Sequence, residues 1–262
     1  MKLVRLIAAS MDLNRRKAMA LVIDGHVTVG GRPVADGTLE VDPARDRVAV
    51  DGKPLAMRPH LYLLMYKPRK ALCSMTDPER RTTVIDLLAR PHRRARPVGR
   101  LDYNTTGVLL LTTDGEMAQA LLRSRTVKRE YMVKLGGNVS DRTFDRWRRG
   151  LTIEGRTMSG ADVKIIQRTE GHAKVLVTLV EGWYHLIHRM AEQTGMRVMK
   201  IHRVRFAGIS LGGLAPGTYR LLTPPEVGYL RRLAGQAQAA DERRRERSAG
   251  PRRRGPINPS SS

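Results

Sequence analysis

An apolar run that follows a polar turn is the feature that most restricts how this chain folds. Val108–Leu111 is bounded by glycine and threonine, a pattern that predicts a strand buried inside a sheet. Asn104–Thr106, just before it, are turn-forming residues. Asp102 therefore lies in a turn at the edge of a predicted core. On spacing alone, an aspartate in such a turn most often accepts hydrogen bonds from nearby backbone amides.

The charge of the chain is strongly unbalanced, with 48 Lys and Arg against 25 Asp and Glu in 262 residues, a net charge of +23. Such a surface attracts polyanions, so nucleic acid is the expected partner, although a solvated or membrane-attracted surface has the same composition. No apolar run approaches the ~20 residues of a membrane-spanning helix, so we expect no membrane insertion. The first residues lack the unbroken apolar stretch of a secretory signal, which predicts a cytoplasmic location.

The sequence offers little for metal binding. Cys73 is the only cysteine, which excludes an internal disulfide and a multi-thiolate zinc site. His185 and His188 lie three residues apart, but two ligands without further partners make a poor metal site. We therefore predict no bound metal and assign Cys73 no role.

Residues 1–58 predict a small domain of their own. Apolar spacing indicates a helix at Leu3–Ile7, a second helix at Ala18–Val22, and short strands from Val27 onward. Asn14 can cap the second helix, and a helix start with basic side chains favours phosphate. The candidate RNA-binding residues are Arg5, Asn14, Arg15, Arg16 and Lys17. A charged helix face that is only solvated is the alternative.

Residues 59–235 alternate between strand-like and helix-like segments, which predicts an α+β domain with a mixed or antiparallel sheet. The expected strands are 61–66, 108–112, 131–135, 163–166, 175–180, 204–210 and 219–222. The expected helices are 84–88, 116–123, 142–149, 184–194 and 225–233. Residues 236–262 predict a basic disordered tail, with the arginines at 243–245 and 252–254 as candidate phosphate contacts.

Three short motifs resemble the central region of the pseudouridine synthases, in the branch that modifies ribosomal RNA. They are Gly99–Asp102, Thr105 with Gly107 two residues later, and Thr113–Gly115 after the apolar strand. The pattern from Arg5 to Val29 likewise resembles the S-four-like RNA-binding domain that often precedes these synthases. The resemblance implies the fold of that family, Asp102 as catalytic nucleophile, no cofactor, and a monomer that acts on RNA.

The reaction of that family breaks the bond between ribose and the uracil nitrogen and rejoins the base through its carbon five. It needs a carboxylate that attacks the sugar or helps to expel the base, a cation beside the carboxylate, and a group that removes a proton. The resemblance implies that Tyr131 stacks on the base and removes the proton. Arg100, two residues before Asp102, is expected to hold phosphate or sugar oxygens. The plain alternatives are an edge-strand aromatic and a surface arginine.

Residues 179–190 resemble the third motif of the family, which consists of a strand, a glycine turn and a helix. The expected substrate-binding residues are Arg100, Arg129, Leu179, His188 and Arg189. His188 stands where relatives carry the Arg or Lys that pairs with the nucleophile, and Leu186 and Trp183 also depart from the family pattern. If the His188 cation is needed, activity falls as pH rises through the imidazole pKa.

These departures leave two functions open. The first is an RNA pseudouridine synthase that acts on ribosomal RNA or a pre-ribosomal particle, with the large subunit favoured by the segment Arg125–Val133. The second is a non-catalytic RNA-binding or ribosome-assembly factor on a synthase-like scaffold. A gain of activity when Arg replaces His188 would favour the first.

Overall fold

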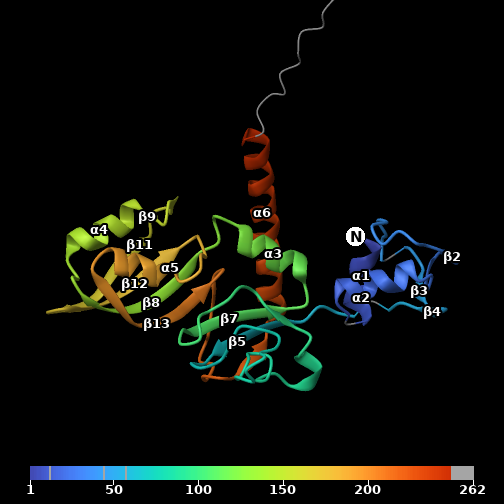
Figure 1. Ribbon diagram of the computed structural model, residues 1–262, viewed down its shortest axis with the longest axis horizontal. Coiled ribbons are helices and arrows are strands. Elements are labelled where there is room, and N and C mark those ends of the chain that lie inside the picture. The colour runs from blue at the N-terminus through green and yellow to red at the C-terminus, as the bar shows by residue number, and fades with distance from the viewer. Residues whose placement is uncertain (12, 44, 57, 249–262) are drawn as a thin grey trace, which may run out of the picture. The chain divides into compact units, whose positions relative to one another are not determined.

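The computed structural model describes residues 1–248 apart from 12, 44 and 57, with side chains described as far as Arg243. The chain divides into two compact units, Met1–Leu61 and a larger one that begins at Tyr62 (Figure 1). Each unit has a hydrophobic core of its own. The division falls close to the domain boundary that the sequence predicts.

The first unit combines two helices with a four-stranded antiparallel sheet. Its elements are α1 Leu3–Met11, α2 Arg15–Ile23, β1 Val27–Val29, β2 Arg32–Pro33, β3 Val48–Val50 and β4 Lys53–Pro54, in the sheet order β2-β1-β3-β4. Leu3, Ile7 and Val22, apolar residues of the two helices, are buried in its core. Gly30 and Gly31 both take positive φ between β1 and β2, as a two-residue hairpin turn requires.

The second unit is built on one nine-stranded sheet in which β13 and β7 are parallel and the other pairs are antiparallel. Its order is β11-β12-β8-β13-β7-β5-β15, with β14 beside β13 and β6 beside β7. The strands are β5 Tyr62–Lys67, β6 Arg96–Pro97, β7 Thr106–Thr112, β8 Arg129–Gly137, β11 Asp162–Thr169, β12 His172–Leu179, β13 Met196–Phe206, β14 Ile209–Ser210 and β15 Tyr219–Leu221. A separate hairpin pairs β9 Thr152–Ile153 with β10 Arg156–Thr157. The mixed sheet confirms the predicted α+β class.

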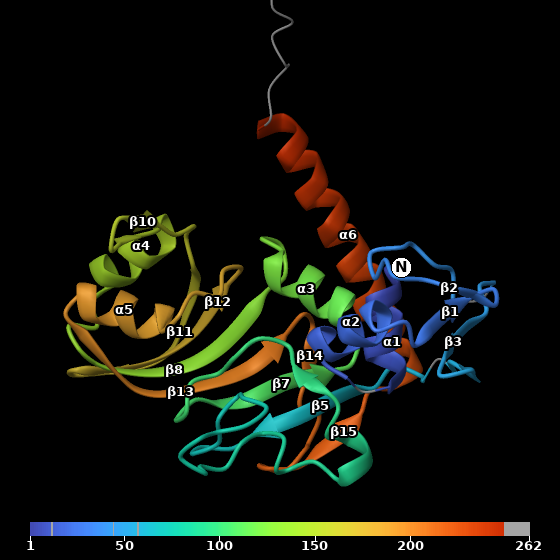
Figure 2. The ribbon, with the colours of Figure 1, turned by 45° about the vertical axis from the view of Figure 1, so that its right-hand side comes forward.

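The helices of the second unit fall into two groups, each with its own core. α4 Asp141–Arg149 and α5 Leu186–Gln193 pack on β8, β11, β12 and β13, where Trp147 and Met190 are fully buried (Figure 2). α3 Gly115–Arg123 and α6 Pro224–Ser248 pack together beside β5 and β7, where Leu121 and Leu230 are fully buried. A short 3-10 helix spans Arg90–His92. The two cores meet where β13 pairs with β7.

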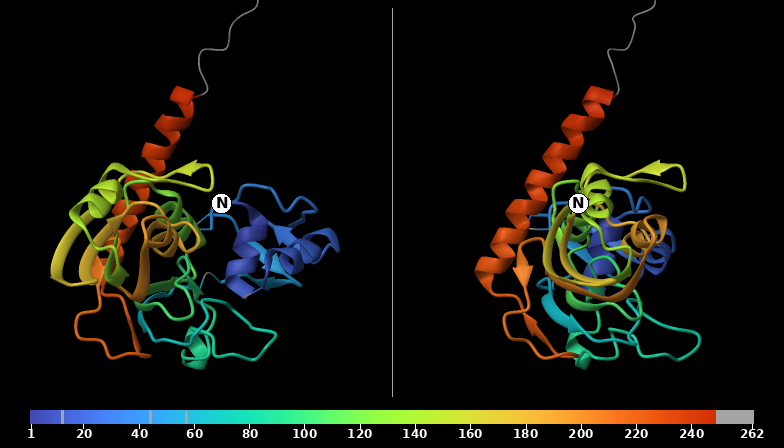
Figure 3. Two further views of the ribbon diagram at one scale, coloured as in Figure 1. Left: turned by 60° about the vertical axis from the view of Figure 1, so that its left-hand side comes forward. Right: turned by 90° about the vertical axis from the view of Figure 1, so that its left-hand side faces the viewer.

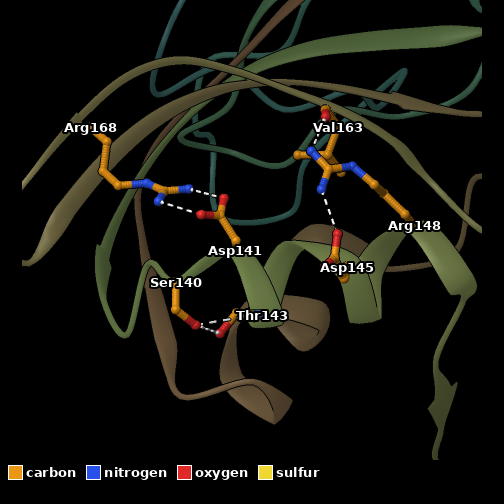
Figure 4. A network of polar contacts seen from close by, with 7 residues as sticks. All are labelled: Ser140, Asp141, Thr143, Asp145, Arg148, Val163 and Arg168. Carbon is orange, nitrogen blue, oxygen red and sulfur yellow. Dashed lines mark hydrogen bonds and ion pairs between the residues drawn. The ribbon is translucent and has the colours of Figure 1, made fainter.

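Ion pairs fix α4 to the edge of the sheet (Figure 4). The Arg168 guanidinium on β11 donates two hydrogen bonds to the Asp141 carboxylate at the start of the helix. Arg148 donates to the Asp145 carboxylate and to the carbonyl oxygen of Val163. The hydroxyl of Ser140 accepts the Thr143 backbone N–H and so caps the helix. These contacts occupy one flank of α4.

Two predicted elements differ in the structure. Residues 84–88 form a series of turns instead of a helix. The Asp86 carboxylate accepts hydrogen bonds from the backbone N–H and hydroxyl of Thr83 at the start of this segment. The strand predicted at 204–210 is the end of β13, a turn at Ala207 and Gly208, and β14. Register shifts within β13 break its two-residue alternation, so the eight residues before Val204 carry no clear strand pattern.

The tail prediction is wrong for residues 236–248, which continue α6 to Ser248 (Figure 3). The segment is rich in alanine, the best helix former, and Ala234 and Ala237 are buried. The hydroxyl of Tyr62 further ties α6 to the sheet, since it accepts from Arg231 and donates to Asp114. Residues 249–262 lie outside the described part of the chain. Within that part, none of the helices combines the length and apolar character of a membrane span.

Candidate active site

A cavity of about 340 Å³ lies where the turn before β7 meets β8, β13, the end of β12 and the start of α5. It brings together residues that are far apart in the sequence. Its walls include Arg100, Leu101, Asp102, Thr105, Arg129, Tyr131, Leu179, Glu181, Trp183, Tyr184, His185, Leu186, His188, Ile201, Arg203 and Phe206. Asp102 opens onto this cavity with a side chain that is 34% exposed.

A buried lysine supports the turn that carries Asp102 by hydrogen bonds to its backbone. Lys67, at the end of β5, has no exposed surface, and its Nζ donates to the carbonyl oxygens of Pro68, Tyr103 and Thr105. Burial lowers the pKa of Lys67 to about 8, although Cys73 and Asp102 act in the opposite direction. Two of the three carbonyls, those of Tyr103 and Thr105, follow Asp102 in the chain. Lys67 therefore fixes the backbone on the C-terminal side of Asp102.

Cys73 supports the residue on the other side of Asp102. The backbone N–H of Leu101 donates to Cys73 Sγ at 3.3 Å. Burial raises the pKa of the thiol, so Cys73 remains protonated at neutral pH. The role of Cys73 here is structural. The sequence assigns this residue no role, because the residues around it do not reveal its contact with Leu101.

Gly107 accounts for the threonine-glycine part of the central motif. A Cβ atom at this position would lie 2.2 Å from the carbonyl oxygen of Arg203, and its φ is +114°. Only glycine therefore lets β7 approach β13 in parallel here. The junction seats the buried Arg203, whose Nε donates to the carbonyl oxygen of Val108. The Nη2 atom of Arg203 has no hydrogen-bond partner among the described residues.

His185 is the residue that contacts the Asp102 carboxylate. Its Nε2 lies 3.2 Å from Asp102 Oδ1, an ion pair when the imidazole is protonated. His185 precedes α5 in the left-handed conformation, with φ +53°, which histidine tolerates better than most residues. The ring stacks on Tyr184 with centroids 3.9 Å apart. The residue pattern suggested only a metal-ligand role for His185, because the pattern does not reveal the backbone conformation of this residue.

His188 lines the same cavity but faces a different environment. Its ring centroid is 5.2 Å from that of His185. Burial lowers the pKa of the His188 imidazole, and although Asp102 acts in the opposite direction, the net shift is downward. Its Nδ1 is buried and has no hydrogen-bond partner among the described residues. The lowered pKa favours the neutral imidazole, whereas the third motif predicts a cation at His188.

Three predicted site residues on the sheet lie in the cavity wall. Tyr131 is half-buried on β8, in register with Val177 on one side and Arg203 on the other. Leu179, the last residue of β12, is buried. Arg129 is also buried, and its guanidinium donates to the carbonyl oxygens of Val127, Val180 and Leu122. These hydrogen bonds use the guanidinium of Arg129 to hold the backbone, including the segment before the turn at Gly182.

Arg100 and Arg189 lie near the exposed ring of Tyr184. Their guanidinium carbons are 6.0 Å and 5.8 Å from its centroid. Arg100 lines the cavity, whereas Arg189 lies outside its wall and pairs with Glu154 at 2.6 Å. Arg100 is exposed and suited to contact phosphate.

The predicted RNA-binding residues belong to the first unit. Asn14 caps α2 by accepting the backbone N–H of Lys17 at 2.9 Å, as the sequence predicts. Arg15, Arg16 and Lys17 are exposed in its first turn, and Arg5 is half-buried on α1. In the described part of the chain, no group of three or more His, Cys, Asp or Glu side chains is placed to bind a metal ion.

Comparisons with known proteins place this geometry in a family. The model of the RNA pseudouridylate synthase family matches residues 61–193. An uncharacterized RNA pseudouridine synthase of Aquifex aeolicus is 35% identical over 237 residues, which cover 88% of this chain and 94% of the relative. A ribosomal large subunit pseudouridine synthase B of Bacillus subtilis is 33% identical over 242 residues, which cover 91% and 99%. A crystal structure of a pseudouridylate synthase superposes with a TM-score of 0.63 at 25% identity, covering 88% of this chain and 99% of the other.

The catalytic fold is thus that of an RNA-modifying isomerase. The chain belongs to the RNA pseudouridylate synthase family and is an RNA pseudouridine synthase. The expectation drawn from the central motif is confirmed at the level of family and reaction class.

Proposed function

We propose that the chain converts a uridine of large-subunit ribosomal RNA to pseudouridine, with Asp102 as the nucleophile. The observation that carries the proposal is the Asp102 carboxylate, which opens onto a cavity that also contains Tyr131 and is contacted by His185. The large subunit is favoured because a curated relative that the chain matches over 99% of its length is named a ribosomal large subunit pseudouridine synthase B. We place the reaction in the cytoplasm, on ribosomal RNA or a pre-ribosomal particle.

In the proposed reaction, the Asp102 carboxylate attacks the ribose carbon that bears the base or helps to expel the base. The bond to the uracil nitrogen breaks, and its electron pair leaves with the base. The uracil turns, and its carbon five forms the new bond to the ribose carbon. If the Asp102 carboxylate has bonded to that carbon, this bond breaks in the same step and the carboxylate is released. Removal of the proton from carbon five and protonation of the nitrogen complete the isomerisation, with no group lost and no redox change.

The remaining residues fit roles in holding the flipped nucleotide. Tyr131 offers an aromatic face and a phenol, which suits both stacking on the uracil and removal of the carbon-five proton. His185, whose Nε2 contacts the Asp102 carboxylate, is suited to hold that carboxylate in position. Arg100 is placed to hold a phosphate or sugar oxygen at the rim. Arg15, Arg16 and Lys17, at the start of α2, are proposed to bind backbone phosphates elsewhere on the RNA.

The test maps pseudouridine by carbodiimide labelling and reverse transcription of large-subunit RNA incubated with the protein. Wild type should produce a new stop, and Asp102→Asn should lower its formation on the order of 10⁴-fold while RNA affinity changes little. Circular dichroism of the variant controls for folding. A stop of equal intensity with Asp102→Asn would exclude this nucleophile.

The alternative function is a non-catalytic RNA-binding or assembly factor, favoured by the neutral His188 in place of a permanent cation. RNA binding without a stop on free or particle-bound RNA would support it. A rise in a low activity on His188→Arg would instead identify an impaired enzyme.

A further inference from the structure

A second cavity, of about 610 Å³, adjoins the catalytic one and has no role in the steps described above. The two share part of their walls, namely Leu122, Glu181, Gly182, Trp183 and Tyr184. The rest of the second cavity comes from the end of α3, the β9–β10 hairpin and Arg189 of α5. Its volume lies within the range of roughly 300–1,000 Å³ that is typical of ligand sites.

The charges in this cavity are unevenly placed. Arg123 and Arg125 lie at the end of α3 and just after it, and both side chains are exposed. Glu154 is neutralised by its ion pair with Arg189. The Glu181 Oε1 atom accepts the backbone N–H and hydroxyl of Ser159. Arg123 and Arg125 form no ion pair among the described residues, so they are available to bind an anion that enters this cavity.

Arg156 and Trp183, in the wall of the same cavity, offer a flat stacking surface. The guanidinium of Arg156 covers the indole ring of Trp183, with its central carbon 3.8 Å from the ring centroid. Trp183 packs on the core below, and Arg156 is exposed above it on the β9–β10 hairpin. Bases of single-stranded RNA stack on arginine planes as well as on aromatic rings. The outer face of Arg156 is therefore suited to a base.

We propose that the second cavity is a nucleotide subsite for the RNA residue next to the target uridine, with its phosphate at Arg123 and Arg125 and its base on the Arg156–Trp183 stack. The proposal rests on the function proposed above. A flipped uridine remains joined to its neighbours through phosphodiesters, so the chain must leave the catalytic cavity across its rim. The rim shared by the two cavities leads directly into the second one.

The subsite also gives a role to Trp183, which departs from the cation usual in the family. A cation at this position would repel Arg156, whereas the indole ring holds the guanidinium by a cation–π contact. This pair also forms the planar surface on which the neighbouring base rests.

The first experiment measures the affinity of the full chain for a fluorescent five-residue oligouridylate at low salt. Arg123→Gln/Arg125→Gln should weaken binding about tenfold by loss of the phosphate contacts. The matched control is Arg142→Gln/Arg146→Gln, which removes the same charge from exposed positions of α4 outside both cavities and should change affinity less than about twofold. Equal losses in the two variants, or no loss in the first, would overturn the subsite.

A second variant tests the stacking surface apart from charge. Arg156→Lys keeps the positive charge but removes the planar group, so affinity should fall about fivefold. Unchanged affinity would exclude base stacking at Arg156. On the RNA fragment that wild type modifies, Arg123→Gln/Arg125→Gln should raise KM more than it lowers kcat. If wild type modifies no RNA, the proposed function fails, while the oligouridylate binding still decides whether the subsite exists.

Discussion

The two sides of the catalytic cavity are built in different ways. The side that carries Asp102 is fixed by buried contacts. These are the hydrogen bonds from Lys67 to backbone carbonyls, the hydrogen bond from the Leu101 N–H to Cys73 Sγ, and the close approach of Gly107 to the Arg203 backbone. On the other side, Leu186 and Ile187 anchor the start of α5 in the core, but His185 before them is held by ring stacking on Tyr184, which is 59% exposed, and the helix has no side-chain cap. The position of the nucleophile is therefore part of the fold, whereas its partner is held by adaptable side chains. Changes on the first side should damage stability and activity together, whereas changes at His185 and Tyr184 should affect activity with little loss of stability.

Gly107→Ala should have the largest effect. The new methyl group would lie 2.2 Å from the Arg203 carbonyl oxygen in a backbone region that alanine avoids. We expect a loss of about 3–5 kcal/mol in the free energy of unfolding, measured by urea denaturation, and loss of pseudouridine formation. Gly115→Ala is the matched control, since a methyl group there meets nothing within 4 Å. Equal stability of the two variants would show that the β7–β13 junction is not fixed in this way.

Lys67→Met should follow, with effects on both stability and activity. It removes the Nζ donor of the Thr105 carbonyl oxygen, whereas the carbonyl oxygen of Tyr103 keeps the backbone N–H of Lys70, and the loss should cost about 1–3 kcal/mol. The exposed Lys128→Met serves as control. Activity should fall with stability, because the backbone beside Asp102 loses its support. A variant with normal stability and activity would contradict the role given to Lys67.

The same lysine makes a second prediction, on pH. Its pKa in the folded protein is about 8, below the ordinary value of 10.5. Between these values the unfolded chain binds more protons, so the free energy of unfolding should rise with pH in wild type relative to Lys67→Met. Urea denaturation of both proteins from pH 8 to pH 10 measures this difference. A difference that falls with pH would mean that the pKa of Lys67 is raised.

On the other side of the cavity, His185→Gln should lower kcat about 10- to 100-fold and leave stability nearly unchanged, because it removes the partner of Asp102. His188→Gln is the matched comparison, since it changes the same residue type one helical turn away without breaking that contact. We expect its effect on kcat to be smaller. A larger loss in His188→Gln would restore His188 as the functional partner of the nucleophile.

The sequence was sufficient to predict the features that depend on short-range patterns. The apolar run of β7, the turn before it and the cap of α2 are local features, and all three lie where the sequence predicts them. His185 could not be assigned in this way, because its contact with Asp102 depends on one left-handed residue and on packing between distant segments. Lys67 has no role assigned from the sequence, since nothing in its neighbours reveals that three carbonyls converge on it. Burial and long-range convergence decide both cases.

The smallest predicted effect concerns the charge of His188. Because burial lowers its pKa in the folded protein, the unfolded chain takes up the proton first as the pH falls. Wild type should therefore lose stability relative to His188→Gln between pH 7 and pH 5. The stability contributed by the neutral imidazole is fully present above the ordinary pKa of 6.5. Urea denaturation of both proteins at the two pH values measures the sign. A relative gain at pH 5 would show a raised pKa, as an ion pair of His188 with Asp102 would produce. The cation expected from the third motif would then be present after all, and the activity of wild type should fall as the pH rises through that pKa.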